Sequence, residues 1–414
     1  MCRYVIKIER SVLMQHNKTD LKQMQSLPLE EKIIMTKERI KVWYESWKKF
    51  EIHDKDTGEI RFVTADMRLG KDEPKLKDTE YIDKVFDGQV YVSFSGGKDS
   101  TVLLHMVRDM YPDVEAVFVN TGLEYPEIQQ FVKSFSNVTI LRPKMRFDEV
   151  IKKYGYPMIS KEVSNTIYGA KNNIKEKQYS LRLAKLGILD TEYGGLQNDG
   201  KYHYHETIKG SKFTCRKYRQ LIDLDANFSD ICCNIMKKEP FAQYEKQTHK
   251  KPFMATMTTE SMLREKNWLK MGCNAFESKK PKSAPMSFWT EQDILQYIKT
   301  RNLSICSVYG DVIYAEDFGQ THIEEYTKYS PDKLITTGCD RTGCIFCGFG
   351  CHLDKAPSRF QRLKETHPRQ YQYCLDGGEH DESGVWKPNK QGLGMKHIFD
   401  ELNMIYGCDF IKYE

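Results

Sequence analysis

The chain of 414 residues lacks a long hydrophobic run, because no apolar stretch approaches the ~20 residues that span a bilayer. Its N-terminus is charged throughout and lacks the apolar core of a secretion signal, so we expect a cytoplasmic protein without a membrane partner. A dominant charge sign is also missing: 63 basic residues face 58 acidic ones, and the net charge is +5. This balance permits nucleic acid binding without requiring it.

Cysteine is absent from a long part of the chain. After Cys2 the next cysteine is Cys215, and four of them then fall between Cys339 and Cys351. Twelve cysteines without a secretion signal indicate metal or redox chemistry more than a disulfide framework.

The chain divides by its pattern into four regions. Residues 1–50 have helical spacing, and residues 51–85 are charged and weakly periodic, which we interpret as an insertion or linker. Residues 86–300 are predicted to form an α/β nucleotide-binding domain. Residues 301–414 are Cys-rich in their first half and are expected to form a C-terminal metal-binding region folded back onto that domain.

Strands and helices alternate in the first half of the third region. The predicted strands are 90–94, 114–119 and 138–141, and the predicted helices are 101–110, 126–135 and 147–154, with a later helix at 289–300. This alternation and spacing are typical of βαβ units. We therefore expect an α/β fold with a parallel, doubly wound sheet, an N-terminal helical segment and a C-terminal Cys-rich segment. In such sheets ligands bind beyond the carboxyl ends of the strands.

A glycine-rich loop, Ser95-Gly96-Gly97-Lys98-Asp99-Ser100, lies between the first of these strands and its helix. Two glycines let the backbone approach an anion closely, the helix adds its positive end, and the lysine adds charge. The loop is neither a Walker A loop nor a dinucleotide fingerprint, since the required glycines are missing. A simple tight turn is the alternative, but a full six-residue match in this context favours a phosphate site.

The loop resembles the SGGxDS signature of PP-loop ATP pyrophosphatases, which cleave ATP between the α and β phosphates. Further stretches resemble bacterial and phage members of the phosphoadenosine phosphosulfate (PAPS) reductase family: residues 119–127, Ser160-Lys161, Cys232-Cys233, and Arg341-Thr342-Gly343-Cys344 followed by Cys347. The similarity covers roughly residues 25–50 and 86–375. It implies an adenine nucleotide alpha hydrolase-like fold.

The resemblance also implies which residues bind the nucleotide. Those expected at the phosphates are Ser93, Ser95, Gly96, Gly97, Lys98, Asp99 and Ser100, of which Lys98 and Asp99 are the catalytic candidates. Thr121 and Gly122 would lie near the adenosine, and Lys161 would contact the nucleotide. Arg264 would face its acidic end, with a solvated surface position as the alternative.

Two cysteine sets compete for a metal. The first resembles the [4Fe–4S] ligands of adenylyl-sulfate reductases and comprises Cys232, Cys233, Cys344 and Cys347. The second is local, suits zinc or a cluster, and comprises Cys339, Cys344, Cys347 and Cys351. We favour the first set, because the second leaves the adjacent pair of cysteines without an explanation.

The catalytic Glu-Cys-Gly of true sulfonucleotide reductases does not occur here, whereas the phosphate loop is intact. We therefore expect an enzyme that uses ATP and Mg²⁺, forms an AMP-activated intermediate and pyrophosphate, and transfers sulfur to an acceptor such as a nucleic acid. The alternatives are a reductase that releases sulfite from PAPS or adenylyl sulfate, and a non-catalytic nucleotide-sensing module. Partners that fit this chemistry are a sulfur-donor protein (a cysteine desulfurase or thioredoxin-like protein) and a second copy in a homodimer.

Overall fold

A computed structural model describes residues 17–71, 73–172, 179–188, 193–196, 202–205, 214–318 and 332–414. The chain forms two compact units, each built from separate stretches of sequence. The first unit comprises Met1–Phe118, Tyr125–Leu141 and Ala242–Thr342, and the second comprises Val119–Glu124, Arg142–Phe241 and Gly343–Glu414. The expected nucleotide domain of residues 86–300 thus contributes to both units.

The first unit is built on a six-stranded sheet in the order β11-β12-β10-β4-β5-β6. Its strands are β4 (Val90–Ser93), β5 (Ala116–Val119), β6 (Val138–Leu141), β10 (Lys251–Met254), β11 (Asn274–Ala275) and β12 (Lys282–Ser283). β4 pairs in parallel with β5 and β10, β10 pairs in parallel with β12, and β11 is antiparallel to β12. The predicted α/β class with a mostly parallel sheet is confirmed.

Helices of the first unit include α2 (Lys18–Ser26), α3 (Leu29–Ser46), α4 (Lys98–Met110), α5 (Pro126–Lys133), α9 (Glu239–Thr248), α10 (Met262–Met271) and α11 (Glu291–Thr300). All four side chains of β5 are buried, as expected for a strand covered on both faces. Apolar residues of α3, α4 and α11 join the same hydrophobic core. α4 begins three residues earlier than predicted, because Lys98, Asp99 and Ser100 form its first turn.

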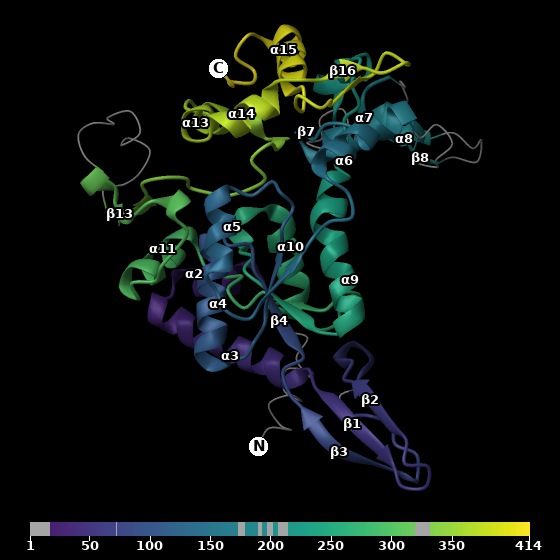
Figure 1. The fold of residues 1–414 in the computed structure, drawn as a ribbon, viewed down its shortest axis with the longest axis vertical. Coiled ribbons are helices and arrows are strands. Elements are labelled where there is room, and N and C mark those ends of the chain that lie inside the picture. Colours follow the sequence, from purple (N-terminus) through teal and green to yellow (C-terminus); the bar gives the residue numbers. More distant parts are fainter. Residues whose placement is uncertain are drawn as a thin grey trace. The chain divides into compact units, whose positions relative to one another are not determined.

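The stretch expected to be an insertion or linker folds as a separate antiparallel sheet, β2-β1-β3 (Figure 1). Its strands are β1 (Lys49–Asp54), β2 (Ile60–Thr64) and β3 (Glu80–Phe86). Phe50, Ile52 and Ala65 form its small core. Many of its apolar side chains are exposed, Phe62 among them, so the alternation that marks a half-buried strand is weak in the sequence.

Short elements complete the first unit: the strands β13 (Val312–Tyr314) and β14 (Leu334–Thr336) and the 3-10 helices η1 (Met67–Leu69), η5 (Thr258–Glu260), η6 (Ser307–Tyr309) and η7 (Ala315–Phe318). No helix in the described ranges has the length and apolar character to cross a membrane.

The second unit is mainly helical, with α6 (Phe147–Tyr154), α7 (Lys161–Asn172), α8 (Tyr179–Lys185), η3 (Arg216–Ile222), the π-helix η4 (Asn234–Lys238), η8 (Cys351–Leu353), α13 (Arg359–Thr366), α14 (Pro368–Leu375) and α15 (Met395–Tyr406) (Figure 1). Its strand pairs are β7 (Met158–Ile159) with β15 (Gly348–Phe349), β8 (Tyr193–Leu196) with β9 (Tyr202–His205), and β16 (Glu379–His380) with β17 (Trp386–Lys387). The parallel pairing of β7 with β15 joins the C-terminal Cys-rich segment to the middle of the chain.

Candidate functional site

The glycine-rich loop lies where the order of strands in the first unit reverses. From β4 the chain continues to β5 and β6 on one side, and it returns much later to β10 on the other side. A crevice opens beyond the carboxyl ends of the strands at such a switch point, and ligands of open α/β sheets bind there. The loop follows the carboxyl end of β4 directly.

The loop is held in shape by its own side chains. The hydroxyls of Ser95 and Ser100 lie 3.0 Å apart, and Ser100 also donates to the carbonyl of Gly97 at 2.9 Å. The Gly97 N–H donates to the Ser95 hydroxyl at 3.3 Å. These bonds fix the backbone at the N-terminus of α4, so an anion there would require little reorganisation of the loop. Ser93, the last residue of β4, is half-buried beside this loop.

Both loop glycines have close neighbours, and the constraint is stronger at Gly96. Gly96 has φ +71°, and a Cβ there would lie 2.8 Å from Val132 and 2.9 Å from Ile128 on α5. A Cβ on Gly97 would lie 3.1 Å from the hydroxyl of Tyr309 and 3.3 Å from that of Thr342. Gly96 therefore lets the loop pack on α5, and Gly97 keeps space in front of the helix end.

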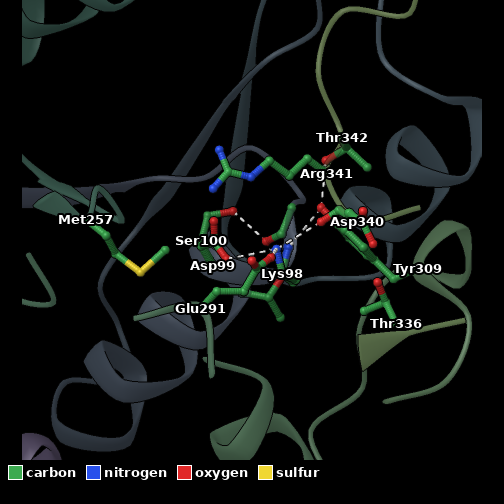
Figure 2. Close-up of polar contacts among 12 residues, drawn as sticks. Lys98, Asp99, Ser100, Met257, Glu291, Tyr309, Thr336, Asp340, Arg341 and Thr342 are labelled. Carbon is green, nitrogen blue, oxygen red and sulfur yellow. Dashed lines mark hydrogen bonds and ion pairs between the residues drawn. The ribbon is translucent and has the colours of Figure 1, made fainter. Parts of the chain in front are cut away.

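Lys98 is the buried cation of the loop, with 3% of its surface exposed. Its Nζ donates to the carbonyl of Asp340 at 3.0 Å and lies 3.2 Å from the Glu291 carboxylate and 3.5 Å from that of Asp99 (Figure 2). It also lies 5.6 Å from the centre of the Tyr309 ring. The site thus combines one fixed positive charge with two carboxylates.

Tyr309, Glu291, Asp340 and Thr342 were not predicted as site residues. The Lys98 N–H donates to the Tyr309 hydroxyl at 3.2 Å, and this hydroxyl lies 2.7 Å from that of Thr342 (Figure 2). Burial raises the pKa of Tyr309, so its hydroxyl stays protonated. Only Thr342 carried a sequence signal, through the Arg-Thr-Gly-Cys motif.

Arg264, in the first turns of α10, belongs to the same surroundings. Burial lowers the pKa of Arg264, the like charge of Arg341 lowers it further, and Asp99 opposes this. Arg264 also pairs with the Glu260 carboxylate. Two guanidinium groups and the loop carboxylate therefore interact in one region, where an anion would relieve the repulsion between the cations.

Thr121 and Gly122 belong to the second unit. The Thr121 hydroxyl donates to the Glu124 carboxylate at 2.7 Å, and its N–H donates to the same group at 3.0 Å. Gly122 has φ +74° and is exposed. The carbonyl of Leu123 accepts a bond from the Ile345 N–H at 2.9 Å, which ties this turn to the Cys344 segment.

Cys232 and Cys233 precede the π-helix η4, and Cys344 and Cys347 precede β15; all four thiols interact in the second unit. A hydrogen bond from Cys232, together with the charge of Lys161, lowers the pKa of Cys233 to about 6. At neutral pH Cys233 is therefore a thiolate, the form that binds metals. The hydrogen bond with Cys233 and burial raise the pKa of Cys232.

The charge of Lys237 acts on two of the remaining thiols, Cys344 and Cys347. Burial raises the pKa of Cys344 to about 11, while the charge of Lys237 opposes the shift. Burial likewise raises the pKa of Cys347. The structure thus places Lys161, expected at the nucleotide, where its charge acts on Cys233.

The local set is divided between the units. Cys339 belongs to the first unit, and its thiol donates to the carbonyl of Arg341 at 2.7 Å. Cys351 belongs to the second unit, is 2% exposed and donates to the carbonyl of Gly348 at 3.0 Å. Burial raises the pKa of Cys351 to about 12, so it stays a thiol.

Comparison with known proteins identifies the family. Residues 89–180 and 198–348, more than half of the chain, match the phosphoadenosine phosphosulfate reductase domain. An uncharacterized protein of Methanocaldococcus jannaschii is 31% identical over 358 residues, which are 82% of this chain and 64% of that protein. An adenosine 5'-phosphosulfate reductase of Bacillus cereus is 29% identical over 118 residues, which are 27% of this chain and 45% of that protein.

Among solved structures, a crystal structure of PAPS reductase from Candida auris in complex with phosphate matches with a TM-score of 0.29 and 14% identity, covering 53% of this chain and 75% of that one. The chain spans less than two thirds of the length of these curated relatives. The family match agrees with the resemblance seen in the loop and in the cysteine motifs, and the chain belongs to the phosphoadenosine phosphosulfate reductase family.

Proposed function

We propose that the chain binds ATP at the loop of residues 95–100 and cleaves it into pyrophosphate and an AMP-activated intermediate, in preparation for sulfur transfer. The observation that carries this proposal is the complete loop at the switch point, with buried Lys98 and two glycines that leave space before the helix end. An enzyme acting on adenylyl sulfate alone has no β and γ phosphates to hold in such a loop.

In this reaction an acceptor oxygen attacks the α-phosphorus, the bond to the β-phosphate oxygen breaks, and pyrophosphate leaves into the loop. The N–H groups at the start of α4 and the Lys98 ammonium would stabilise the charge that develops on the leaving group. Asp99 and Glu291, both beside Lys98, are the oxygen donors that suit Mg²⁺. A sulfur nucleophile then displaces AMP, and nucleic acids are the acceptor class we propose.

The donor set Cys232, Cys233, Cys344 and Cys347 fits an iron–sulfur cluster, because a lowered pKa favours the thiolate of Cys233 and the charges of Lys161 and Lys237 act on the set. Tetrahedral zinc with bonds of ~2.3 Å needs sulfurs roughly 3.8 Å apart. Within the described part of the chain, no group of three ligand atoms within 4.8 Å of one another contains a cysteine. We therefore propose a [4Fe–4S] cluster, which when bound would supply electron or sulfur transfer.

A second candidate is sulfonucleotide reduction with release of sulfite, which the name of the Bacillus cereus relative favours. A third is a nucleotide-sensing role without turnover. Sulfur would come from a cysteine desulfurase or thioredoxin-like protein in the first candidate, and a thioredoxin-like protein would supply reducing power in the second.

The test is pyrophosphate release from ATP with nucleic acid present as the acceptor, and sulfite release from PAPS, by anaerobically purified protein. On our proposal ATP yields pyrophosphate, and Lys98→Ala slows this by roughly 100- to 1,000-fold, as expected for loss of one preorganised charge. Lys37→Ala is the matched control, since Lys37 is an exposed lysine paired with Asp109 on the surface. Sulfite from PAPS without pyrophosphate from ATP would establish the second candidate, and binding without either product the third.

A further inference from the structure

We propose that Asp225, His380 and His397 form a binding site for a divalent transition-metal ion, with zinc as the natural occupant, in the second unit. Their ligand atoms all lie within 4.8 Å of one another. The site is separate from the cysteine set, and no part of the proposed nucleotide chemistry uses it.

The distances are close to those of ligands around one ion. The Asp225 carboxylate lies 2.6 Å from His380 Nε2, and both of its oxygens lie 3.1 Å from His397 Nε2. Tetrahedral zinc with bonds of ~2.0–2.1 Å to nitrogen and oxygen places neighbouring ligands roughly 3.3 Å apart, so the 3.1 Å pairs need little movement and the 2.6 Å pair must open by roughly 0.7 Å. Two imidazoles and one carboxylate are also a donor set that zinc and iron(II) use in proteins.

The backbone of Asp225 is held from two directions. The Trp386 N–H, from β17, donates to the Asp225 carbonyl at 2.7 Å. The Lys171 ammonium, from α7, donates to the carbonyls of Leu224 and Ala226 at 2.7 and 3.0 Å. The carboxylate is therefore presented by a fixed turn, which reduces the entropy lost when a ligand is captured.

The two imidazoles are positioned by the indole of Trp386. The centre of its ring lies 4.3 Å from that of His397 and 5.0 Å from that of His380, and its Nε1 donates to the Gly394 carbonyl at 2.9 Å. Gly378 and Gly394, both with positive φ, make room for it: a Cβ would lie 2.3 Å from the indole at Gly378 and 2.9 Å at Gly394. This packing fixes the start of α15, which carries His397.

The site is open to solvent on one side. The side chains of His380, Asp225 and His397 are 49%, 34% and 27% exposed. Three protein ligands with an accessible face leave room for water or an external ligand at a fourth position. The other group of this kind in the described residues, Glu51, His53 and Asp83, has one imidazole, and its His53 Nε2 lies 3.9 Å from the Asp83 carboxylate, so it is the weaker candidate.

The test is zinc binding by the full chain under anaerobic conditions, followed by competition with a chromophoric chelator and by zinc-edge X-ray absorption. We expect one zinc per chain whose first shell contains nitrogen and oxygen but no sulfur, which separates it from zinc on cysteines. His397→Gln and Asp225→Asn should weaken this zinc at least 100-fold, while His249→Gln and His53→Gln keep parental affinity. His249 is exposed and lies in the first unit.

Absence of sulfur-free zinc in the parent, or parental affinity in His397→Gln, would overturn the proposal and leave a metal-free hydrogen-bonded network. Circular dichroism and the melting temperature with chelator present check that the variants fold. If Asp225→Asn unfolds, His380→Gln replaces it, because the half-exposed His380 is not part of the core.

Discussion

The phosphate loop of the first unit and the cysteine set of the second unit are built in opposite ways. The loop is one continuous stretch of six residues whose hydroxyls and N–H groups bond mainly to each other. The cysteine set joins Cys232-Cys233 to Cys344 and Cys347, more than a hundred residues apart, and lysines from two further positions tune it. The backbone of the loop thus depends on local hydrogen bonds, whereas the cysteine set forms only when distant parts of the second unit fold together.

The largest expected effect is the loss of bound iron when one cysteine of the set is replaced. Cys233→Ser should abolish the brown absorbance and the iron of anaerobically purified protein, because Cys233 is the thiolate of the set and serine is a poor replacement ligand. Cys351→Ser should largely preserve both, since its buried thiol bonds to the Gly348 carbonyl. Iron, zinc and sulfide analysis of both variants distinguishes the two cysteine sets. A colourless parent protein whose zinc is lost only in Cys351→Ser would support the local set instead.

The next effect concerns the loop alone. Gly97→Ala should lower the rate of pyrophosphate release by about 10- to 100-fold, because the added Cβ presses on Tyr309 and Thr342 and displaces the helix end. Gly343→Ala is the matched control, since its Cβ would meet nothing within 4 Å. Iron content should be parental in both. An unchanged rate in Gly97→Ala would mean that the phosphates lie elsewhere.

The smallest expected effect is a loss of stability in the first unit that leaves the second unit unchanged. Lys32 is 2% exposed, and its ammonium lies 2.7 and 2.8 Å from the oxygens of Asp293, joining α3 to α11. Lys32→Met should lower the free energy of unfolding of the first unit by roughly 3 kcal/mol, because it leaves a buried carboxylate without its cation.

In the control Arg301→Met, which removes an exposed pair with Glu30, the loss should stay below about 1 kcal/mol. Urea denaturation followed by tryptophan fluorescence measures both, and iron absorbance reports on the second unit. Equal losses in the two variants would contradict the buried role of the Lys32 pair.

Local features were predictable from the sequence. The strand and helix that flank the loop, and the parallel sheet, follow from apolar spacing and glycine chemistry, and the structure has them with boundaries shifted by up to three residues. The loop motif and the paired cysteines also gave the family, which the match over residues 89–180 and 198–348 confirms.

Long-range neighbours were not predictable. Tyr309 and Glu291 lie beside Lys98 only because η6 and the start of α11 are packed near the loop, and neither has a local motif. The antiparallel sheet β2-β1-β3 was not predicted, because apolar residues on its exposed face weaken the alternation of apolar and polar residues that marks a strand. The division of the chain into interleaved units depends on pairings such as β7 with β15, which no spacing rule gives.

The pairing of β7 with β15 has a consequence for how the protein is made. Met158 and Ile159 are 0% and 1% exposed in the finished fold, yet their strand partner, Gly348–Phe349, is translated almost two hundred residues later. At ribosomal rates of ~5–20 residues per second, this apolar strand waits roughly 10 to 40 seconds for its partner. During synthesis these apolar residues are therefore without their strand partner, the condition in which exposed strands aggregate.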